Sequence, residues 1–272
     1  MRLIENLRAG GLALIGPPAP RDGAVTSRAL PPWPGWRRAA AAVLLVAIIT
    51  LLAMIWLDPW WHSIAPTLSP LADRTWHVIT DLGLSGWILV PSGVALLVIA
   101  LFWRCDAPVK AKGLCAMLVA RLGYVFLSVA LPGTAVDIGK RLIGRARPKV
   151  WGTNEWVFHA FGWNAKYASL PSGHSTTAFA AAVAISVIWP RLRVVMWPLA
   201  ALIAASRVVL NEHRPSDVIA GALVGVLSAL LIRTWFARQD LVFRMDATGM
   251  VRAEPCPPVG QVLGAFRACF KL

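Results

Sequence analysis

The chain has 272 residues, of which 57% are hydrophobic and 15% are charged, and its mean hydropathy is +0.63. Soluble proteins carry about 25% charged residues, so this composition excludes an ordinary soluble domain and indicates an integral membrane protein. The formal net charge of +14 raises the question of nucleic acid. No basic run is interleaved with soluble folded sequence, however, so we expect no nucleic-acid partner.

The first part of the chain predicts a tail, a membrane span and a surface segment. Residues 1–38 combine several arginines with many glycines and prolines, which favours a flexible cytoplasmic tail. Residues 39–57 form an apolar run of the length that a bilayer core requires. Asp-Pro-Trp-Trp follows at 58–61, where small cleavage-site residues would stand in a signal peptide, so we expect an uncleaved span. Residues 58–86 are amphipathic and are expected to lie on the membrane surface.

Five further apolar runs predict five more spans, at 87–103, 114–138, 175–189, 194–210 and 217–236. Arg121 lies inside the third of these runs, so either its side chain snorkels to the membrane face or the span begins after it. Residues 237–272 are polar and basic and show no clear fold. We therefore expect an all-α integral membrane protein, with a six-helix bundle at 39–236 between two basic tails.

The distribution of cationic residues predicts the orientation of this bundle. The two tails and the predicted inner loops carry 17 Lys and Arg residues, whereas the predicted outer loops carry 9. Because cytoplasmic segments are enriched in Lys and Arg, both termini are expected in the cytoplasm. The protein would then be a multi-pass protein of the plasma (inner) membrane, with its outer loops facing the periplasm of a bacterial cell.

Three polar clusters stand at the borders of predicted spans on that outer side. They are Lys140 with Arg147-Pro148, then Pro171-Ser172-Gly173-His174, then Ser206-Arg207 with His213 and Asp217. Phosphoryl transfer depends chiefly on positioning and on stabilising the charge of the phosphoryl oxygens. Three cationic side chains, two histidines and a carboxylate are suited to that chemistry.

The clusters divide into phosphate-binding and catalytic residues. Lys140, Arg147 and Arg207 supply positive charge, and each arginine can bond two oxygens at once. Ser172 and Gly173 precede a predicted helix, whose N-terminal N–H groups and dipole favour an anion, and Gly173 permits its close approach. Asp137 precedes Lys140 by three positions and is interpreted as its local ion-pair partner.

The histidines and the aspartate are the predicted catalytic residues. Asp217 lies four residues after His213, about one helical turn, and can accept the Nδ1 proton of that imidazole. The Nε2 atom of His213 is then free to act as a nucleophile. His174 would protonate the departing alcohol oxygen, since a histidine titrates near neutral pH.

Taken together, the clusters resemble the signature of the type-2 phosphatidic acid phosphatase superfamily, in the order K-x6-RP, PSGH and SR-x5-H-x3-D. The match covers about residues 75–236 and includes every signature letter. The resemblance implies the six-helix membrane fold shared with vanadium haloperoxidases and a phosphohistidine intermediate formed without metal. It also implies His213 as nucleophile, Asp217 as its assistant and His174 as general acid. Lys140, Arg147, Ser172, Gly173 and Arg207 would hold the phosphate.

The expected function is hydrolysis of a phosphomonoester or pyrophosphate of a membrane lipid. Phosphatidic acid, phosphatidylglycerol phosphate, undecaprenyl pyrophosphate and a phosphorylated lipid A are all candidate substrates, and the oligomeric state is open. The alternatives are a lipid phosphotransferase using the same site, a vanadate haloperoxidase and a non-catalytic lipid-binding scaffold. No cofactor is expected, and the His and Asp spacing matches no common metal-ligand pattern.

Overall fold

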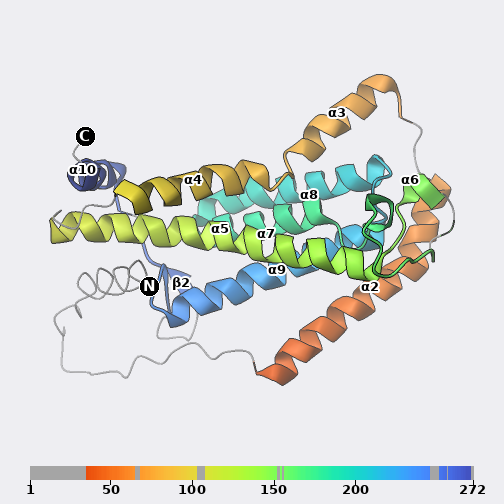
Figure 1. Ribbon diagram of the computed structural model, residues 1–272, viewed down its shortest axis with the longest axis horizontal. Helices are drawn as coiled ribbons and strands as arrows, with labels where there is room; N and C mark the ends of the chain where they lie inside the picture. The colour runs from red at the N-terminus through yellow and green to blue at the C-terminus, as the bar shows by residue number, and fades with distance from the viewer. Residues whose placement is uncertain are drawn as a thin grey trace. The chain divides into compact units, whose positions relative to one another are not determined.

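The computed structural model describes residues 35–64, 68–102, 108–151, 154, 156–245, 251–255 and 257–270. The main helices are α2 (Trp36–Ile64), α3 (Pro70–Asp81), α4 (Gly86–Phe102), α5 (Val109–Ile143), α6 (Pro148–Trp151), α7 (Gly173–Ile188), α8 (Arg193–Val209), α9 (Pro215–Arg238) and α10 (Val259–Phe270). Two short 3₁₀ turns lie at Ala165–Tyr167 and Pro190–Leu192. Strands β1 (Phe243–Met245) and β2 (Val251–Ala253) pair antiparallel (Figure 1).

Five stretches within the described residues are long and apolar enough to cross a membrane. They are Trp36–Ile64, Pro70–Leu101, Ala111–Ile143, Pro190–Val209 and Pro215–Arg238. Helix α7 is apolar but has only 16 residues, which span about 24 Å at 1.5 Å per residue. The prediction of a mainly helical, multi-pass membrane protein is confirmed, and the sixth crossing, through α7, stays a prediction.

The chain forms two compact units, and one of them contains all three motif clusters. This unit comprises residues 33–89 and 127–232. In it α7 packs between α8 and α9 (Figure 1). The contacts use small side chains, with Ala178 and Ala182 facing α8 and Ala180 facing α9. A Cβ on Gly225 would stand 2.4 Å from the carbonyl oxygen of Thr176, so only glycine allows α9 to approach α7 this closely.

Helix α2 extends beyond the predicted end of the first span. It continues through Pro59 to Ile64, so part of the segment expected on the membrane surface belongs to the same helix. Most of its large apolar side chains are exposed, as they would be when facing lipid. Asp58 differs, because only 2% of its surface is exposed. Asp58, which follows the predicted first span in the sequence, thus lies inside the fold.

Helix α3 also differs from the expected surface segment, because it packs against α8. It begins where the Ser69 hydroxyl accepts a hydrogen bond from the N–H of Ala72, with Pro70 in the first turn. Near its end Thr80 is 3% exposed and faces the neighbouring helix. An otherwise exposed amphipathic helix therefore contributes one buried polar group.

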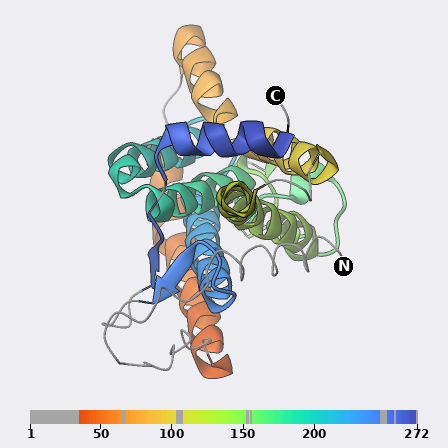
Figure 2. The same ribbon diagram turned by 90° about the vertical axis from the view of Figure 1, so that its left-hand side faces the viewer.

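The second unit contains residues 90–126 and 233–270, and it corrects the expectation for the C-terminal segment. The sequence of residues 237–272 shows no clear fold, yet its described part contains the paired strands β1 and β2 and helix α10 (Figure 2). Phe243 lies edge-on to the ring of Tyr124, with ring centroids 4.8 Å apart. The Arg121 guanidinium donates to the carbonyl of Glu254 at 2.7 Å. Backbone carbonyls thus accept hydrogen bonds from Arg121, which is buried in α5 inside the candidate span Ala111–Ile143.

Candidate active site

The end of α8 brings Arg207 and His213 to the same place. Asn211 adopts a left-handed conformation with φ of 56°, which terminates the helix as asparagine and glycine commonly do. The N–H of Asn211 then bonds to the carbonyl of Val208, and the N–H groups of Glu212 and His213 both bond to the carbonyl of Arg207. The spacing between Arg207 and His213 is therefore that of a Schellman helix end.

The beginning of α9 places Asp217 behind His213. Pro215 occupies the first helical position, and Asp217, two residues later, turns its carboxylate back to accept the N–H of Arg214 at 3.0 Å. The same oxygen, Oδ2, accepts the hydroxyl of Ser169 at 2.6 Å. It also lies 3.7 Å from Nδ1 of His213. The helix cap therefore fixes the carboxylate that faces the imidazole.

His213 is buried beside this carboxylate but is not yet hydrogen-bonded to it. Its Nδ1 has no hydrogen-bond partner among the described residues, since 3.7 Å exceeds the hydrogen-bond range. Such contacts commonly shorten when substrate binds. Burial lowers the pKa of His213, and this outweighs the opposing effect of Asp217. The imidazole is accordingly neutral at neutral pH, the form that a nucleophile requires.

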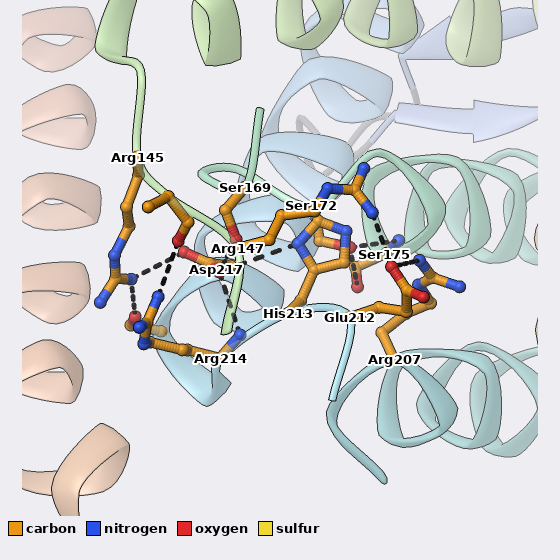
Figure 3. A network of polar contacts seen from close by, with 12 residues as sticks. Arg145, Arg147, Ser169, Ser172, Ser175, Arg207, Glu212, His213, Arg214 and Asp217 are labelled. Carbon is orange, nitrogen blue, oxygen red and sulfur yellow. Dashed lines mark hydrogen bonds and ion pairs between the residues drawn. The ribbon is translucent and has the colours of Figure 1, made fainter. Parts of the chain in front are cut away.

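A buried arginine holds Asp217 from the other side (Figure 3). Arg145 Nη1 donates to Asp217 Oδ1 at 2.7 Å and to the Ser216 hydroxyl at 2.6 Å, while Nη2 donates to Asp58 Oδ2 at 2.8 Å. Asp58 in turn accepts the N–H of Ser216 at 2.9 Å. Burial lowers the pKa of Arg145, but the two carboxylates outweigh it and raise the pKa above its usual value. The guanidinium therefore stays charged.

Sequence reasoning missed Asp58 and Arg145. Asp58 follows the first predicted span and was interpreted as part of an interfacial segment, although an acid within a membrane helix is by default a candidate for function. Arg145 lies among the six unspecified residues between Lys140 and Arg147. Only the fold shows that these two side chains meet across 87 residues of sequence.

The Pro171–His174 turn is tied to the same helix end. The N–H of Ser172 donates to the backbone carbonyl of Asp217 at 2.9 Å. The Ser172 hydroxyl caps α7 by accepting from the N–H of Ser175 at 3.5 Å and from its hydroxyl at 3.1 Å. Figure 3 shows these serines beside His213. The N-termini of α7 and α9 therefore lie together at one site.

Lys140 and Gly173 also meet at this turn. A Cβ on Gly173 would lie 3.9 Å from Lys140 Nζ, which is an ordinary contact distance. Lys140 Nζ pairs with Asp137, and this confirms the local ion pair predicted for the aspartate. The Lys140 side chain is only 18% exposed, so its ammonium is held at the N-terminus of α7 rather than in open water.

His174 stands in the first turn of α7 among the cationic side chains. Burial lowers the pKa of His174 to about 3, together with the nearby positive charges of Arg207, His213, Arg147 and Lys140. The imidazole is therefore neutral at neutral pH in this structure. A Cβ on Gly83 would stand 3.1 Å from its Cδ2 atom, so the loop after α3 closes against the ring. The structure thus brings together all eight residues that the motifs nominate.

The two arginines are partly neutralised by an acid that the sequence did not nominate. Glu212 Oε2 accepts from Arg147 Nη1 at 2.6 Å and lies 3.7 Å from Arg207 Nη2. Arg207 Nη1 donates to the hydroxyl of Thr80 at 2.9 Å. The Nε atoms of Arg147 and Arg207 are buried and have no hydrogen-bond partner among the described residues.

Acidic and cationic side chains lie on different sides of the two histidines. Acidic groups lie on the Nδ1 side of His213, whereas Lys140, Arg147 and Arg207 surround His174. Within the described part of the chain no three His, Cys, Asp or Glu side chains form a metal-ligand group. Such an arrangement can hold an anion against two imidazoles through arginine, lysine and helix N-termini. The apolar helices and this site together are those expected of a membrane protein that binds a phosphate group.

Comparison with known proteins gives the family. A profile of the PAP2 superfamily matches residues 121–240. The lipid A 1-phosphatase of Rhizobium etli is 34% identical over 197 residues, which cover 70% of this chain and 82% of that protein. The lipid A 1-phosphatase of Rhizobium johnstonii is 34% identical over 180 residues, or 64% of this chain and 71% of that protein. The chain belongs to the PAP2 superfamily.

A solved structure supports the same fold. A transmembrane PAP2-type phosphatidylglycerolphosphate phosphatase from Bacillus subtilis superposes with a TM-score of 0.50. The two chains are 22% identical, and the match covers 72% of this chain and 94% of the other. The helical architecture is therefore shared, at a level of identity that does not extend to the substrate.

Replacing Arg145 by methionine is expected to destabilise the protein by about 3–5 kcal/mol, because Asp58 and Asp217 would remain buried without their common cation. Unfolding by heat or denaturant in detergent micelles measures the change. Arg141→Met is the matched control, since the hydrogen bond from Arg141 to the Trp163 carbonyl is exposed, and it should change stability by less than about 1 kcal/mol. Equal stability of the two variants would contradict a structural role for the buried network.

Proposed function

We propose that this protein is a lipid phosphatase of the inner membrane that removes a phosphate through a phosphohistidine on His213, without a metal ion. The observation that carries the proposal is the placement of His213 between Asp217 and a cluster of three cationic side chains. The carboxylate supports an imidazole that becomes positively charged, and the cations support the oxygens of the phosphoryl group.

The first chemical step transfers the phosphoryl group to the enzyme. A proton on His213 Nδ1 faces Asp217 Oδ2, which leaves the lone pair of Nε2 to attack phosphorus. The N–P bond forms as the P–O bond to the lipid breaks. His174, neutral in the structure, takes up a proton when the phosphate dianion offsets the surrounding cations, and it gives this proton to the departing lipid oxygen. Arg147, Arg207 and Lys140 stabilise the charge on the three phosphoryl oxygens.

The second step returns the enzyme to its starting state. His174, now neutral, removes a proton from a water molecule whose oxygen attacks phosphorus on the side opposite to Nε2. The N–P bond breaks and its electron pair returns to the imidazole of His213. Orthophosphate is released, and His174 then gives up the proton that it took from water, so the cycle is balanced without any cofactor.

Among the candidate substrates, a phosphorylated lipid A fits best. Three relatives carry the name lipid A 1-phosphatase, and the third, from Porphyromonas gingivalis, is 37% identical over 127 residues. That third match covers 45% of this chain and 24% of the relative. The inference about the substrate therefore depends on the two Rhizobium proteins. We infer that the 1-phosphate of lipid A is the group removed.

Phosphate release by the purified protein from a lipid panel tests the substrate. Lipid A should give a value of kcat/KM at least about tenfold above phosphatidic acid, phosphatidylglycerol phosphate and undecaprenyl pyrophosphate. Mass spectrometry of the product identifies the phosphate that is lost. Activity should persist in EDTA, and loss that one divalent ion restores would contradict the metal-independent mechanism. A preference for another lipid would remove lipid A and leave the phosphatase assignment standing.

Replacing His213 by alanine is expected to lower turnover by about 10³-fold or more, because the nucleophile is lost while the fold around it remains. Acid quenching during turnover of a labelled substrate should trap an acid-labile phosphoprotein in the wild type and none in His213→Ala. His159→Ala is the matched control, since this exposed histidine packs against Tyr167 outside the cationic cluster. More than a tenth of wild-type activity in His213→Ala would exclude the nucleophilic role.

The site is proposed to face the periplasm, with both termini in the cytoplasm. A cysteine replacing Ala165, an exposed residue of the loop before α7, should react with an impermeant maleimide in spheroplasts. A cysteine replacing exposed Gln261 of α10 should react only after the membrane is opened. Both variants are made with the four native cysteines replaced by alanine. The opposite labelling pattern would place the site in the cytoplasm.

A further inference from the structure

Glu212 lies where the substrate phosphate is expected to bind. Its Oε2 atom is 2.6 Å from Arg147 Nη1 and 3.7 Å from Arg207 Nη2. These two arginines are the phosphate ligands that the motifs nominate. Figure 3 shows the Glu212 carboxylate between the two guanidinium groups and close to His213. The side chain is therefore an anion of the protein that already occupies cationic groups meant for the substrate.

This carboxylate is ionised at neutral pH. Burial raises the pKa of Glu212, but the hydrogen bond from Lys149 and the charges of Lys149, Arg207 and Arg147 outweigh it. The net result is a pKa below the usual value. A dianionic phosphate that approaches the same two arginines would thus meet a full negative charge within a few ångströms.

Lys149 offers Glu212 a second position. Its Nζ atom donates to Oε1, the other carboxylate oxygen, at 2.7 Å. The Lys149 side chain is 47% exposed, whereas that of Glu212 is 20% exposed, so the lysine lies on the solvent side of the acid. The carboxylate can turn away from the arginines and keep a cationic partner, which lowers the cost of its displacement.

The backbone couples this acid to the nucleophile. Glu212 immediately precedes His213, and the N–H groups of both residues bond to the carbonyl of Arg207. The left-handed Asn211 before them sets the direction of the turn. Glu212 is therefore held at a defined position at the phosphate site and does not reach it from a mobile loop.

We propose that Glu212 is an internal competitor of the substrate phosphate, an inference that rests on the proposed function. The carboxylate turns toward Lys149 when the lipid phosphate binds Arg147 and Arg207, and it returns to the arginines as orthophosphate leaves. Glu212 thereby weakens the binding of both substrate and product phosphate. Its role is to keep a strongly cationic site from retaining its product.

Glu212→Gln tests this role, because glutamine keeps the size and the hydrogen-bond acceptor but removes the charge. We expect the KM for the lipid and the inhibition constant of orthophosphate each to fall by about tenfold. Glu212→Asp keeps the charge and should stay within about threefold of the wild type for both constants. A rise of either constant in Glu212→Gln would show that Glu212 only positions the arginines. If neither constant changed, the charge of Glu212 would have no effect on phosphate binding, and the proposal would be overturned.

The matched control is Asp73→Asn, which removes the same charge from an exposed position of α3, where Asp73 pairs with His77. Both constants should match the wild type in this variant. If the wild type releases no phosphate from any lipid, the proposed function fails, but the role of Glu212 is still testable. Binding of orthophosphate, followed by calorimetry in detergent, should then be about tenfold tighter in Glu212→Gln, and equal binding would overturn the inference.

Discussion

One buried arginine joins the parts of the molecule from which the site is built. Arg145 donates to Asp58 of α2 and to Asp217 of α9, and its own backbone belongs to the loop after α5. The two carboxylates and the guanidinium have no solvent exposure. Burying any one of these charges without its partners would cost several kcal/mol of folding free energy, on the order known for buried ion pairs. The position of Asp217, and with it the orientation of His213, therefore depends on a helix that carries no signature residue.

The remaining geometry follows from how two helices end and begin. Asn211 terminates α8 through a left-handed residue, and Asp217 caps α9, so Arg207, Glu212 and His213 fall on a short connection with little freedom. The number of residues between Arg207 and His213 is thus set by the end of α8, and the number between His213 and Asp217 by the cap of α9. Residues of the candidate site also satisfy backbone groups that a helix end would leave unpaired.

The sequence predicted those parts of the molecule whose signals are local. Apolar runs indicated membrane helices, and residues at helix borders indicated the eight site positions. Asp58 and Ser216 are 158 residues apart, and nothing in the neighbourhood of either points to the other. Glu212 occupies an unspecified position of the third motif, where a charge looks like part of a solvated turn. The hairpin after α9 escaped prediction because its strands have three residues each, too few to show alternation.

The charges of the site are arranged in opposition across His213. Behind the imidazole, Asp58 and Asp217 share a single arginine, so this side keeps one negative charge. In the mechanism proposed above, that charge is balanced when His213 carries the phosphoryl group and its imidazole is positively charged. In front of it, Lys140, Arg147 and Arg207 favour an anion, and Glu212 reduces that excess before substrate arrives. A site with three free cations would bind phosphate tightly in every state, product included. An internal carboxylate that gives way to phosphate weakens the binding of substrate, transition state and product alike. It therefore favours release of the product and leaves the barrier between bound substrate and transition state unchanged.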